Sequence, residues 1–155
     1  MASILVVGTG DIGGHLAQDL AREGHDVTGV RRSDKPVGEG VQVISADVSD
    51  ASTLTDLPDN IDIVVYSVAA PVFSKEGYHA YYVKGLKNIL KKLKGQTPKR
   101  VFFVSSSSVY HQMDGEWVDE NSETTPSSFA GKEMLAAEKV LLDSAFGGTV
   151  VRFTG

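Results

Sequence analysis

The stretch Gly8-Thr9-Gly10-Asp11-Ile12-Gly13 decides the fold of this chain, because of what stands on either side of it. It directly follows the β-branched run Ser3–Val7, and it opens the segment Asp11–Glu23, whose apolar residues recur at intervals of four. A G-x-G-x-x-G pattern between a strand and a helix is typical of a turn that binds phosphate groups. The sequence therefore predicts a strand, a glycine turn and a helix whose N-terminus holds an anion.

Each glycine of this turn has its own physical task. Gly8 permits a tight turn, Gly10 lets the backbone approach a pyrophosphate because it lacks a Cβ, and Gly13 lets the helix pack closely on the strand. Asp11 is expected to cap the helix, with its side chain pointing aside. A purely structural glycine turn is the alternative. The residues predicted to hold the pyrophosphate of a dinucleotide are Gly8, Thr9, Gly10, Asp11, Ile12 and Gly13.

The rest of the chain alternates short apolar runs with longer helical stretches. The runs predicted as strands are Ser3–Val7, Val27–Val30, Val41–Ile44, Ile61–Val68, Arg100–Ser105 and Thr149–Phe153. The predicted helices are Asp11–Glu23, Asp50–Leu57 (closed by Pro58), Tyr78–Leu93 and Pro126–Ser144, the last with Leu135, Leu141 and Leu142 inward. This alternation favours an α/β fold, a doubly wound parallel Rossmann sheet of about six strands in the order 3-2-1-4-5-6 with helices on both faces. We expect a single domain over residues 1–155.

Composition excludes several classes of function. The 155 residues carry a net charge of −5 and include no cysteine, which excludes disulfides, thiolate nucleophiles and cysteine-based metal sites. No histidine has a partner at metal-binding spacing, so no metal site is predicted. The densest basic run, Lys84–Lys94, has the spacing of a solvated helix face, which argues against nucleic-acid binding. No apolar run reaches the ~20 residues that cross a bilayer, so we expect no membrane partner and a cytoplasmic location.

The end of the second predicted strand bears on the choice of dinucleotide. An NAD-binding unit usually places a carboxylate there to accept a hydrogen bond from the ribose 2′-hydroxyl. Here the strand ends Val30-Arg31-Arg32-Ser33, and the nearest carboxylate, Asp26, lies at its beginning. Two guanidinium groups and a hydroxyl suit a 2′-phosphate, so Arg31, Arg32 and Ser33 predict NADP(H) in preference to NAD(H). The alternative is that both arginines face solvent in a turn.

Six segments of the chain form a set: Gly8–Gly13, Ala46–Val48, Val64–Ala70, Gly85–Leu90, Ser105–Tyr110 and Met134–Glu138. As a set they resemble the extended and atypical short-chain dehydrogenase/reductases, and more narrowly the NAD-dependent epimerase/dehydratase family. The resemblance implies that Asp47 and Val48 contact the adenine of the cofactor. It further implies cofactor contacts at Val68, Ala69, Ala70 and Ser105, and an active-site hydroxyl at Ser106.

One departure from the family concerns proton transfer. The family uses a Tyr-x-x-x-Lys pair, in which the phenol exchanges a proton with the substrate hydroxyl. Alignment with the family puts Ala130 at the tyrosine position and Met134 at the lysine position. Lys132 stands two residues early, about 200° around the helix, and should face away from the site. Tyr110 and Tyr82 are the candidate phenols that remain, with Tyr110 the better placed.

The resemblance implies an NAD(P)-dependent epimerase, dehydratase or reductase that acts on a hydroxyl or keto group of a small, sugar-like substrate. Ser106 and Tyr110 are its candidate catalytic residues. Because the catalytic pair is missing, enzymatic activity stays open, and a non-catalytic NADP(H)-binding regulatory or interaction module is the alternative. A decayed domain that binds nothing well is a third possibility. In the family a substrate domain follows the strand at Val150–Gly155, so we expect a truncated product or a site that a partner chain closes. The resemblance also implies a homodimer that forms through the helices Tyr78–Leu93 and Pro126–Ser144.

Overall fold

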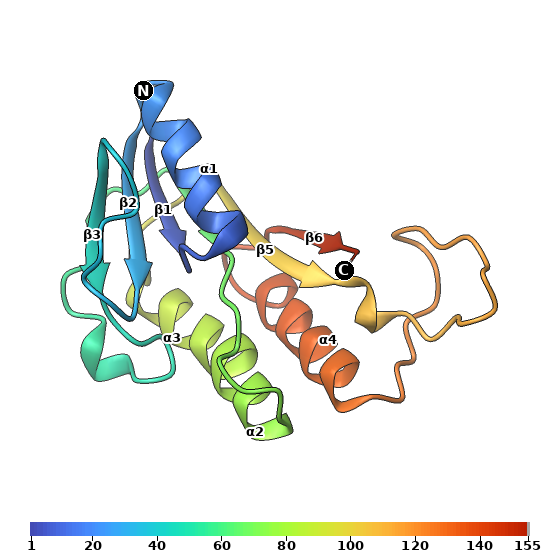
Figure 1. Ribbon diagram of the computed structural model, residues 1–155. Helices are drawn as coiled ribbons and strands as arrows, with labels where there is room; N and C mark the ends of the chain where they lie inside the picture. The colour runs from blue at the N-terminus through green and yellow to red at the C-terminus, as the bar shows by residue number, and fades with distance from the viewer. Residues whose placement is uncertain (155) are drawn as a thin grey trace.

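The strands form where β-branched and apolar residues run together. The computed structural model describes residues 1–154, and these contain six strands: β1 (Ser3–Val7), β2 (Asp26–Arg31), β3 (Val41–Ser45), β4 (Ile63–Tyr66), β5 (Arg100–Ser106) and β6 (Thr149–Phe153). The strands pair in parallel in the order β3-β2-β1-β4-β5-β6 (Figure 1). Val7 of β1 stands between Val30 of β2 and Tyr66 of β4. The predicted sheet and its strand order are confirmed.

Helices cover both faces of this sheet. Helix α1 (Asp11–Arg22) lies on one face. A continuous helical stretch lies on the other, made of α2 (Lys75–Tyr78), the π-helical segment η2 (His79–Lys84) and α3 (Gly85–Lys92), beside α4 (Phe129–Leu142) (Figure 1). From the centre of the sheet the chain winds toward β3 in one direction and toward β6 in the other. The carboxyl ends of β1 and β4 lie at this reversal, where doubly wound sheets form their ligand crevice.

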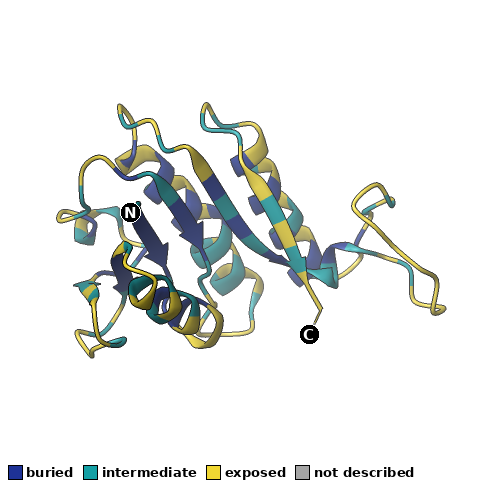
Figure 2. Ribbon diagram, turned by 90° about the horizontal axis from the view of Figure 1, so that it is seen from above, coloured by how far each residue is buried: buried dark blue, intermediate teal, exposed yellow. Residues whose placement is uncertain are grey.

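The core lies on both sides of β1, so each of its inner residues is buried. Leu5 and Val7 pack with Tyr66, Leu86, Ile89 and Phe103 beneath α3 and α4, whereas Ile4, Val6, Ala17 and Val27 pack beneath α1. Full burial of each large aliphatic side chain contributes about 1.5–3 kcal/mol. Figure 2 shows the central strands buried along their length and β6 exposed at alternate residues. The crevice is therefore built at the ends of the most deeply buried strands of the sheet.

The predicted helix Asp50–Leu57 is wrong. Only a 3₁₀ turn, η1 (Ala51–Thr53), forms there. The Asp50 side chain accepts a hydrogen bond from the Ser52 N–H at 3.0 Å, and the Thr53 hydroxyl donates to the carbonyl of Asp47. Such local side-chain hydrogen bonds offer the backbone an alternative to a helix. They explain why the helix predicted from the spacing of apolar residues does not form.

The other helices differ from prediction at their ends. The stretch predicted from Tyr78 begins at Lys75, because the Ser74 hydroxyl caps it by accepting from the Gly77 N–H. Helix α4 begins at Phe129 rather than Pro126, since Ser128 caps it in the same way. Leu141 is buried as predicted, but Leu142 is 57% exposed, so its predicted inward orientation is wrong.

Residues 110–128 connect η3 (Ser107–Val109) to α4 without a helix or strand. Figure 1 shows this connection, in orange, extending past the edge of the sheet beside β6. Its side chains Met113 and Trp117 are almost fully exposed. Within residues 1–154, no helix is both long enough and apolar enough to cross a membrane, and no cluster of His, Asp and Glu could hold a metal ion.

Candidate functional site

The glycine turn after β1 has the geometry that its sequence predicts. Gly8 has a φ of +87°, and a Cβ there would stand 2.5 Å from the carbonyl oxygen of Ser67, so the position requires glycine. The Gly8 N–H donates to the Val30 carbonyl at 2.9 Å, which ties the turn to β2. A Cβ at Gly13 would overlap the Gly8 carbonyl, which confirms the close packing of helix on strand.

The N-terminus of α1 is open toward the crevice. Gly10 is the N-cap residue and therefore offers no side chain to the first backbone N–H groups of the helix. A Cβ at Gly10 would meet no atom within 4 Å. Asp11 is the first helical residue, so its predicted role as the cap is wrong. Its side chain is 97% exposed and lies 3.7 Å from His15 Nδ1, pointing aside as predicted. The unpaired N–H groups can thus bind an anion.

Two adjoining pockets lie at the carboxyl ends of the strands. We call the one toward β2 the first pocket; it is lined by Gly8, Thr9, Gly10, Val30, Arg31, Arg32, Ala46, Val48, Ser67, Val68, Ala69 and Tyr81. The second pocket, toward β5, is lined by Gly10, Asp11, Ile12, Ser67, Val68, Ala69, Tyr82, Val104, Ser105, Ser106, Met134, Phe153 and Thr154. They share Gly10 and the segment 67–69, so an extended ligand can cross from one to the other over the glycine turn.

Most of the residues predicted from sequence line one of these pockets, and five do not: Tyr110, which is described below, and Gly13, Ser33, Ala70 and Asp47. Gly13 packs beneath the turn. Ser33 lies beyond Arg32 and lines neither pocket. Ala70 contributes only its N–H, which donates to the Tyr82 hydroxyl at 3.3 Å. Asp47 is set back behind the first pocket.

Asp47 is held by hydrogen bonds within the protein. Its Oδ1 accepts from the N–H and hydroxyl of Ser49 at 2.9 and 2.7 Å, and its Oδ2 accepts from the Tyr81 hydroxyl at 3.0 Å. Partial burial acts to raise the pKa of Asp47, but the hydrogen bonds from Ser49 and Tyr81 and the charge of Arg32 outweigh it, so the pKa lies below its ordinary value. Asp47 is therefore an anion with both oxygens engaged.

Two buried hydroxyl groups in the pockets have no hydrogen-bond partner in residues 1–154. They are Thr9 Oγ1 in the first pocket and Ser105 Oγ in the second, in residues 6% and 4% exposed. Buried polar groups are normally paired, so each is a candidate ligand contact. The neighbouring Ser106 hydroxyl accepts from the Ser108 N–H at 3.1 Å, which leaves its own hydrogen free for an acceptor in the second pocket.

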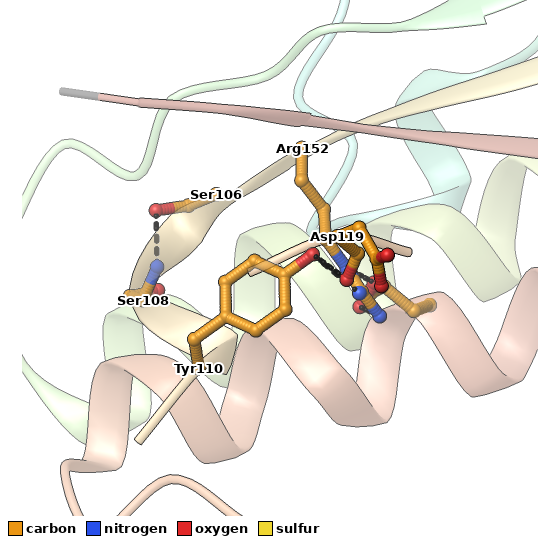
Figure 3. Close-up of polar contacts among 6 residues, drawn as sticks. Ser106, Ser108, Tyr110, Asp119 and Arg152 are labelled. Carbon is orange, nitrogen blue, oxygen red and sulfur yellow. Dashed lines mark hydrogen bonds and ion pairs between the residues drawn. The ribbon is translucent and has the colours of Figure 1, made fainter. Parts of the chain in front are cut away.

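Tyr110 lies outside both pockets, because the turn η3 carries it away from Ser106. Its hydroxyl donates to the Asp119 carbonyl at 2.8 Å and accepts from Arg152 Nη1 at 3.0 Å. Figure 3 shows the phenol aimed at these partners, with the Ser106 side chain pointing the other way. The expectation that Tyr110 is the better placed phenol is wrong, since Tyr82 is the one that lines the second pocket.

Arg152 joins Tyr110 and Asp119 to Glu138 of helix α4, and we call these four residues the Arg152 cluster. Its guanidinium donates to both carboxylate oxygens of Glu138, at 2.7 and 3.3 Å, and stands 5.0 Å from the centre of the Tyr110 ring. The hydrogen bond to Glu138 is the main reason that the pKa of Arg152 lies above its ordinary value. Glu138 is only 2% exposed, so without Arg152 its carboxylate would be buried and lack this partner. The sequence offered no signal for this pair, because its members lie on different elements.

The positions of the family's proton-transfer pair are apolar. Met134 is 4% exposed and lines the second pocket, and Ala130 is nearly as buried. Lys132 is exposed and lines neither pocket, which confirms that it faces away. Among the described residues, the second pocket is thus lined by five that carry hydroxyl groups, Ser67, Tyr82, Ser105, Ser106 and Thr154, and by no lysine.

Sequence reasoning missed Tyr81, and weighed Tyr82 only as the poorer phenol. These consecutive residues lie on the π-helical segment η2 and line different pockets, Tyr81 the first and Tyr82 the second. Single-turn π segments within helices are frequent at functional sites. A regular helical repeat gives no hint of such a turn, and the Tyr81-Tyr82 pair itself was the only available signal.

Comparisons with known proteins agree with this geometry. A family profile described as NAD(P)H-binding matches residues 8–155. The chain is 42% identical to a protein from Methylobacillus flagellatus assigned as an NAD-dependent epimerase/dehydratase, with a TM-score of 0.81 over 99% of this chain and 54% of that one. It is also similar to MoeE5 in complex with UDP-glucose and NAD (28% identity, TM-score 0.81, 97% of this chain, 54% of that one). The UDP-galactose 4-epimerase structure is a third match (26%, 0.83, 97% and 55%). No curated protein matches the sequence. The chain spans about half the length of these solved relatives.

Proposed function

This chain belongs to the NAD(P)H-binding family and is related to NAD-dependent epimerase/dehydratase proteins, and from that premise we propose that it binds NADP(H) in preference to NAD(H) across the first and second pockets. The observation that carries the proposal is the pair of adjoining pockets over an open helix N-terminus, with the guanidinium groups of Arg31 and Arg32 at one end.

The pyrophosphate of the dinucleotide belongs at Gly10. Its missing Cβ leaves space above the N-terminus of α1, where unpaired N–H groups and the helix dipole attract an anion. The unpartnered Thr9 and Ser105 hydroxyls lie on either side of this point, one in each pocket. A dinucleotide whose pyrophosphate lies at Gly10 would place its adenosine in the first pocket and its nicotinamide in the second.

The preference for a 2′-phosphate rests on the end of β2. Arg31 and Arg32 both line the first pocket, and within residues 1–154 no carboxylate lines it. A carboxylate there would accept from a ribose 2′-hydroxyl and repel a phosphate, whereas arginine binds phosphate through charge-assisted hydrogen bonds. MoeE5 is described with NAD, so the arginines are the feature on which a different preference of this chain depends.

We extend the proposal to an oxidoreductase or epimerase reaction at a hydroxyl or keto group of a small, sugar-like substrate. NADP(H), when bound, supplies hydride exchange. The Ser106 hydrogen is free to donate to a substrate oxygen, since the Ser108 N–H occupies the serine oxygen. Tyr82 is the phenol on this pocket, and its oxygen accepts from the Ala70 N–H at 3.3 Å, which leaves its own hydrogen free to donate to a ligand oxygen.

A non-catalytic NADP(H)-binding module is the second candidate. The apolar Ala130 and Met134 at the positions of the proton-transfer pair favour it. NADPH oxidation by the chain with any small carbonyl compound, abolished in Ser106→Ala, would contradict this candidate. A stable complex with a partner that forms only in the presence of NADPH would support it.

Calorimetric titration with NADPH and NADH tests the binding proposal. We expect micromolar affinity for NADPH and affinity weaker by at least about tenfold for NADH, which corresponds to about 1.4 kcal/mol. Arg31→Met and Arg32→Met should weaken NADPH binding only. Arg22→Met is the matched control, because Arg22 pairs with Asp19 on the outer face of α1. Equal affinities would contradict the preference, and binding of neither dinucleotide would contradict the proposal and favour a decayed domain.

We also propose a homodimer in which α3 and α4 of two chains pack together. The analogy with the family supports it, and both helices lie on the same face of the sheet, opposite α1 (Figure 1). Light scattering at micromolar concentration should give twice the mass of the chain, and a monomeric mass would refute the dimer. A cytoplasmic location stays a prediction from composition.

A further inference from the structure

We infer that Tyr81 is a positioning residue that determines cofactor specificity, because its ring holds the Arg32 guanidinium over the first pocket, where it can bind a 2′-phosphate. The inference rests on the proposed preference for NADP(H). Neither the glycine motif nor the arginine pair at the end of β2 gives a reason to single out Tyr81 from the sequence.

Arg32 is free of protein partners for its charge. Its Cζ stands 5.6 Å from the centre of the Tyr81 ring, within the range of a cation–π interaction. In residues 1–154, no carboxylate forms an ion pair with Arg32, and its guanidinium donates no hydrogen bond. Arg31, by contrast, directs one nitrogen to the Lys35 carbonyl at 3.4 Å. The Tyr81 ring is therefore the one contact that orients the exposed Arg32 side chain without using its donors.

Tyr81 also engages Asp47, a carboxylate on which the charge of Arg32 acts. Asp47 is close enough for the charge of Arg32 to act on it, and an ion pair between the two would compete with a bound phosphate. The Tyr81 hydroxyl donates to Asp47 Oδ2 at 3.0 Å, and Ser49 donates to Oδ1. Both oxygens are thus satisfied without Arg32. The Tyr81 side chain therefore orients Arg32 and also binds Asp47, the carboxylate that would compete with a phosphate for Arg32.

The fold holds Tyr81 in place from beneath. The hydroxyl of Tyr66, a residue fully buried on β4, donates to the Tyr81 carbonyl. Burial raises the pKa of Tyr66 well above its ordinary value, so this hydroxyl stays a donor at neutral pH. Tyr81 lies on the helical segment η2 and lines the first pocket, while its neighbour Tyr82 lines the second. The position of the ring is thus set by the core and not by the surface loop of Arg32.

The test is the ratio of the dissociation constants for NADH and NADPH, measured by calorimetry in the full chain. Tyr81→Leu removes the ring and the hydroxyl, and we expect NADPH affinity to fall by about fivefold, the fold-change of an exposed cation–π contact, with NADH affinity unchanged. Tyr81→Phe keeps the ring and should retain most of the ratio. Arg32→Met should lose the ratio, and adding Tyr81→Leu to it should cause no further change. Tyr78→Leu is the matched control, because Tyr78 lies on the same helical stretch and lines neither pocket.

The outcomes separate this inference from the proposed function. If wild type prefers NADPH and Arg32→Met loses that preference while Tyr81→Leu keeps it, the inference is overturned and the proposed function stands. If wild type binds both dinucleotides equally, both are overturned. A purely structural role for Tyr81 would weaken NADH and NADPH alike, which also overturns the inference. Should Tyr81→Leu fail to fold, Tyr81→Met keeps most of the side-chain volume without the ring, and the same ratio applies to it.

Discussion

The two pockets of this site differ in what they offer a ligand. The first has charged and hydrogen-bonding groups already arranged for an anionic nucleotide, with Arg32 stacked on Tyr81 and the Thr9 hydroxyl unpartnered. The second has hydroxyl groups among apolar side chains, and Met134 stands at the position where the family resemblance leads one to expect a lysine. The difference teaches that binding and chemistry can diverge within one crevice. The features that would hold the dinucleotide remain, while those of ordinary proton transfer do not.

The largest effect is expected from a change in the Arg152 cluster, which lies outside both pockets. Arg152→Met leaves the buried Glu138 without its partner, and we expect the free energy of unfolding to fall by about 3–5 kcal/mol. The affinities for NADPH and NADH should change by less than about twofold, since Arg152 lines neither pocket. Chemical denaturation and calorimetry measure the two quantities.

A matched double variant sharpens this prediction. Arg152→Met combined with Glu138→Leu removes both charges and should recover most of the lost stability, because no unpaired charge is then buried. A double variant as unstable as Arg152→Met would show that packing rather than charge pairing is the cause. A large loss of cofactor affinity in either variant would show that cofactor binding depends on the Arg152 cluster as well as on the pockets.

The next effect concerns the floor that the two pockets share. Gly10→Ala puts a methyl group into the space above the N-terminus of α1, and both NADPH and NADH should bind at least about tenfold more weakly. Stability should change by less than about 0.5 kcal/mol, because the new Cβ meets no protein atom within 4 Å.

Gly13→Ala is the contrasting variant in the same turn. Its Cβ would overlap the Gly8 carbonyl, so we expect a loss of stability of about 1–3 kcal/mol. Thermal unfolding together with calorimetry separates the two results. If Gly10→Ala destabilised the fold as much as Gly13→Ala, or bound both dinucleotides normally, the pyrophosphate would not lie at Gly10.

The smallest effect is the acid dependence of Asp47, behind the first pocket. Its pKa in the folded state is lowered from the ordinary 3.8, so the ionised group stabilises the fold above that pH, and this contribution is lost as pH falls through the lowered value. Asp47→Asn should cost about 0.5–1 kcal/mol at pH 7. The unfolding free energies of variant and wild type should converge below pH 3.8, and parallel curves over the whole range would contradict the prediction.

The parts of this molecule that sequence could predict are those that depend on local repeats. The strand β1, the glycine turn and α1 follow from the period of apolar residues and from glycines at fixed offsets, and the strand order follows from their alternation. The prediction failed at Asp50–Leu57, where hydroxyl and carboxylate side chains bond to the local backbone, and at Leu142, where periodicity could not tell the outer edge of α4 from its buried face.

The candidate site divides along the same line. The amino-acid sequence by itself determined the anion-binding turn, the arginines at the end of β2 and the absence of the Tyr-x-x-x-Lys pair, since each is a matter of residue type at a known offset. Only the tertiary structure decided that Tyr110 turns to Arg152, that Tyr82 replaces it on the second pocket, and that Tyr81 lies beneath Arg32. These contacts join residues from different elements. No local pattern encodes such contacts, because they depend on how the strands and helices pack against one another.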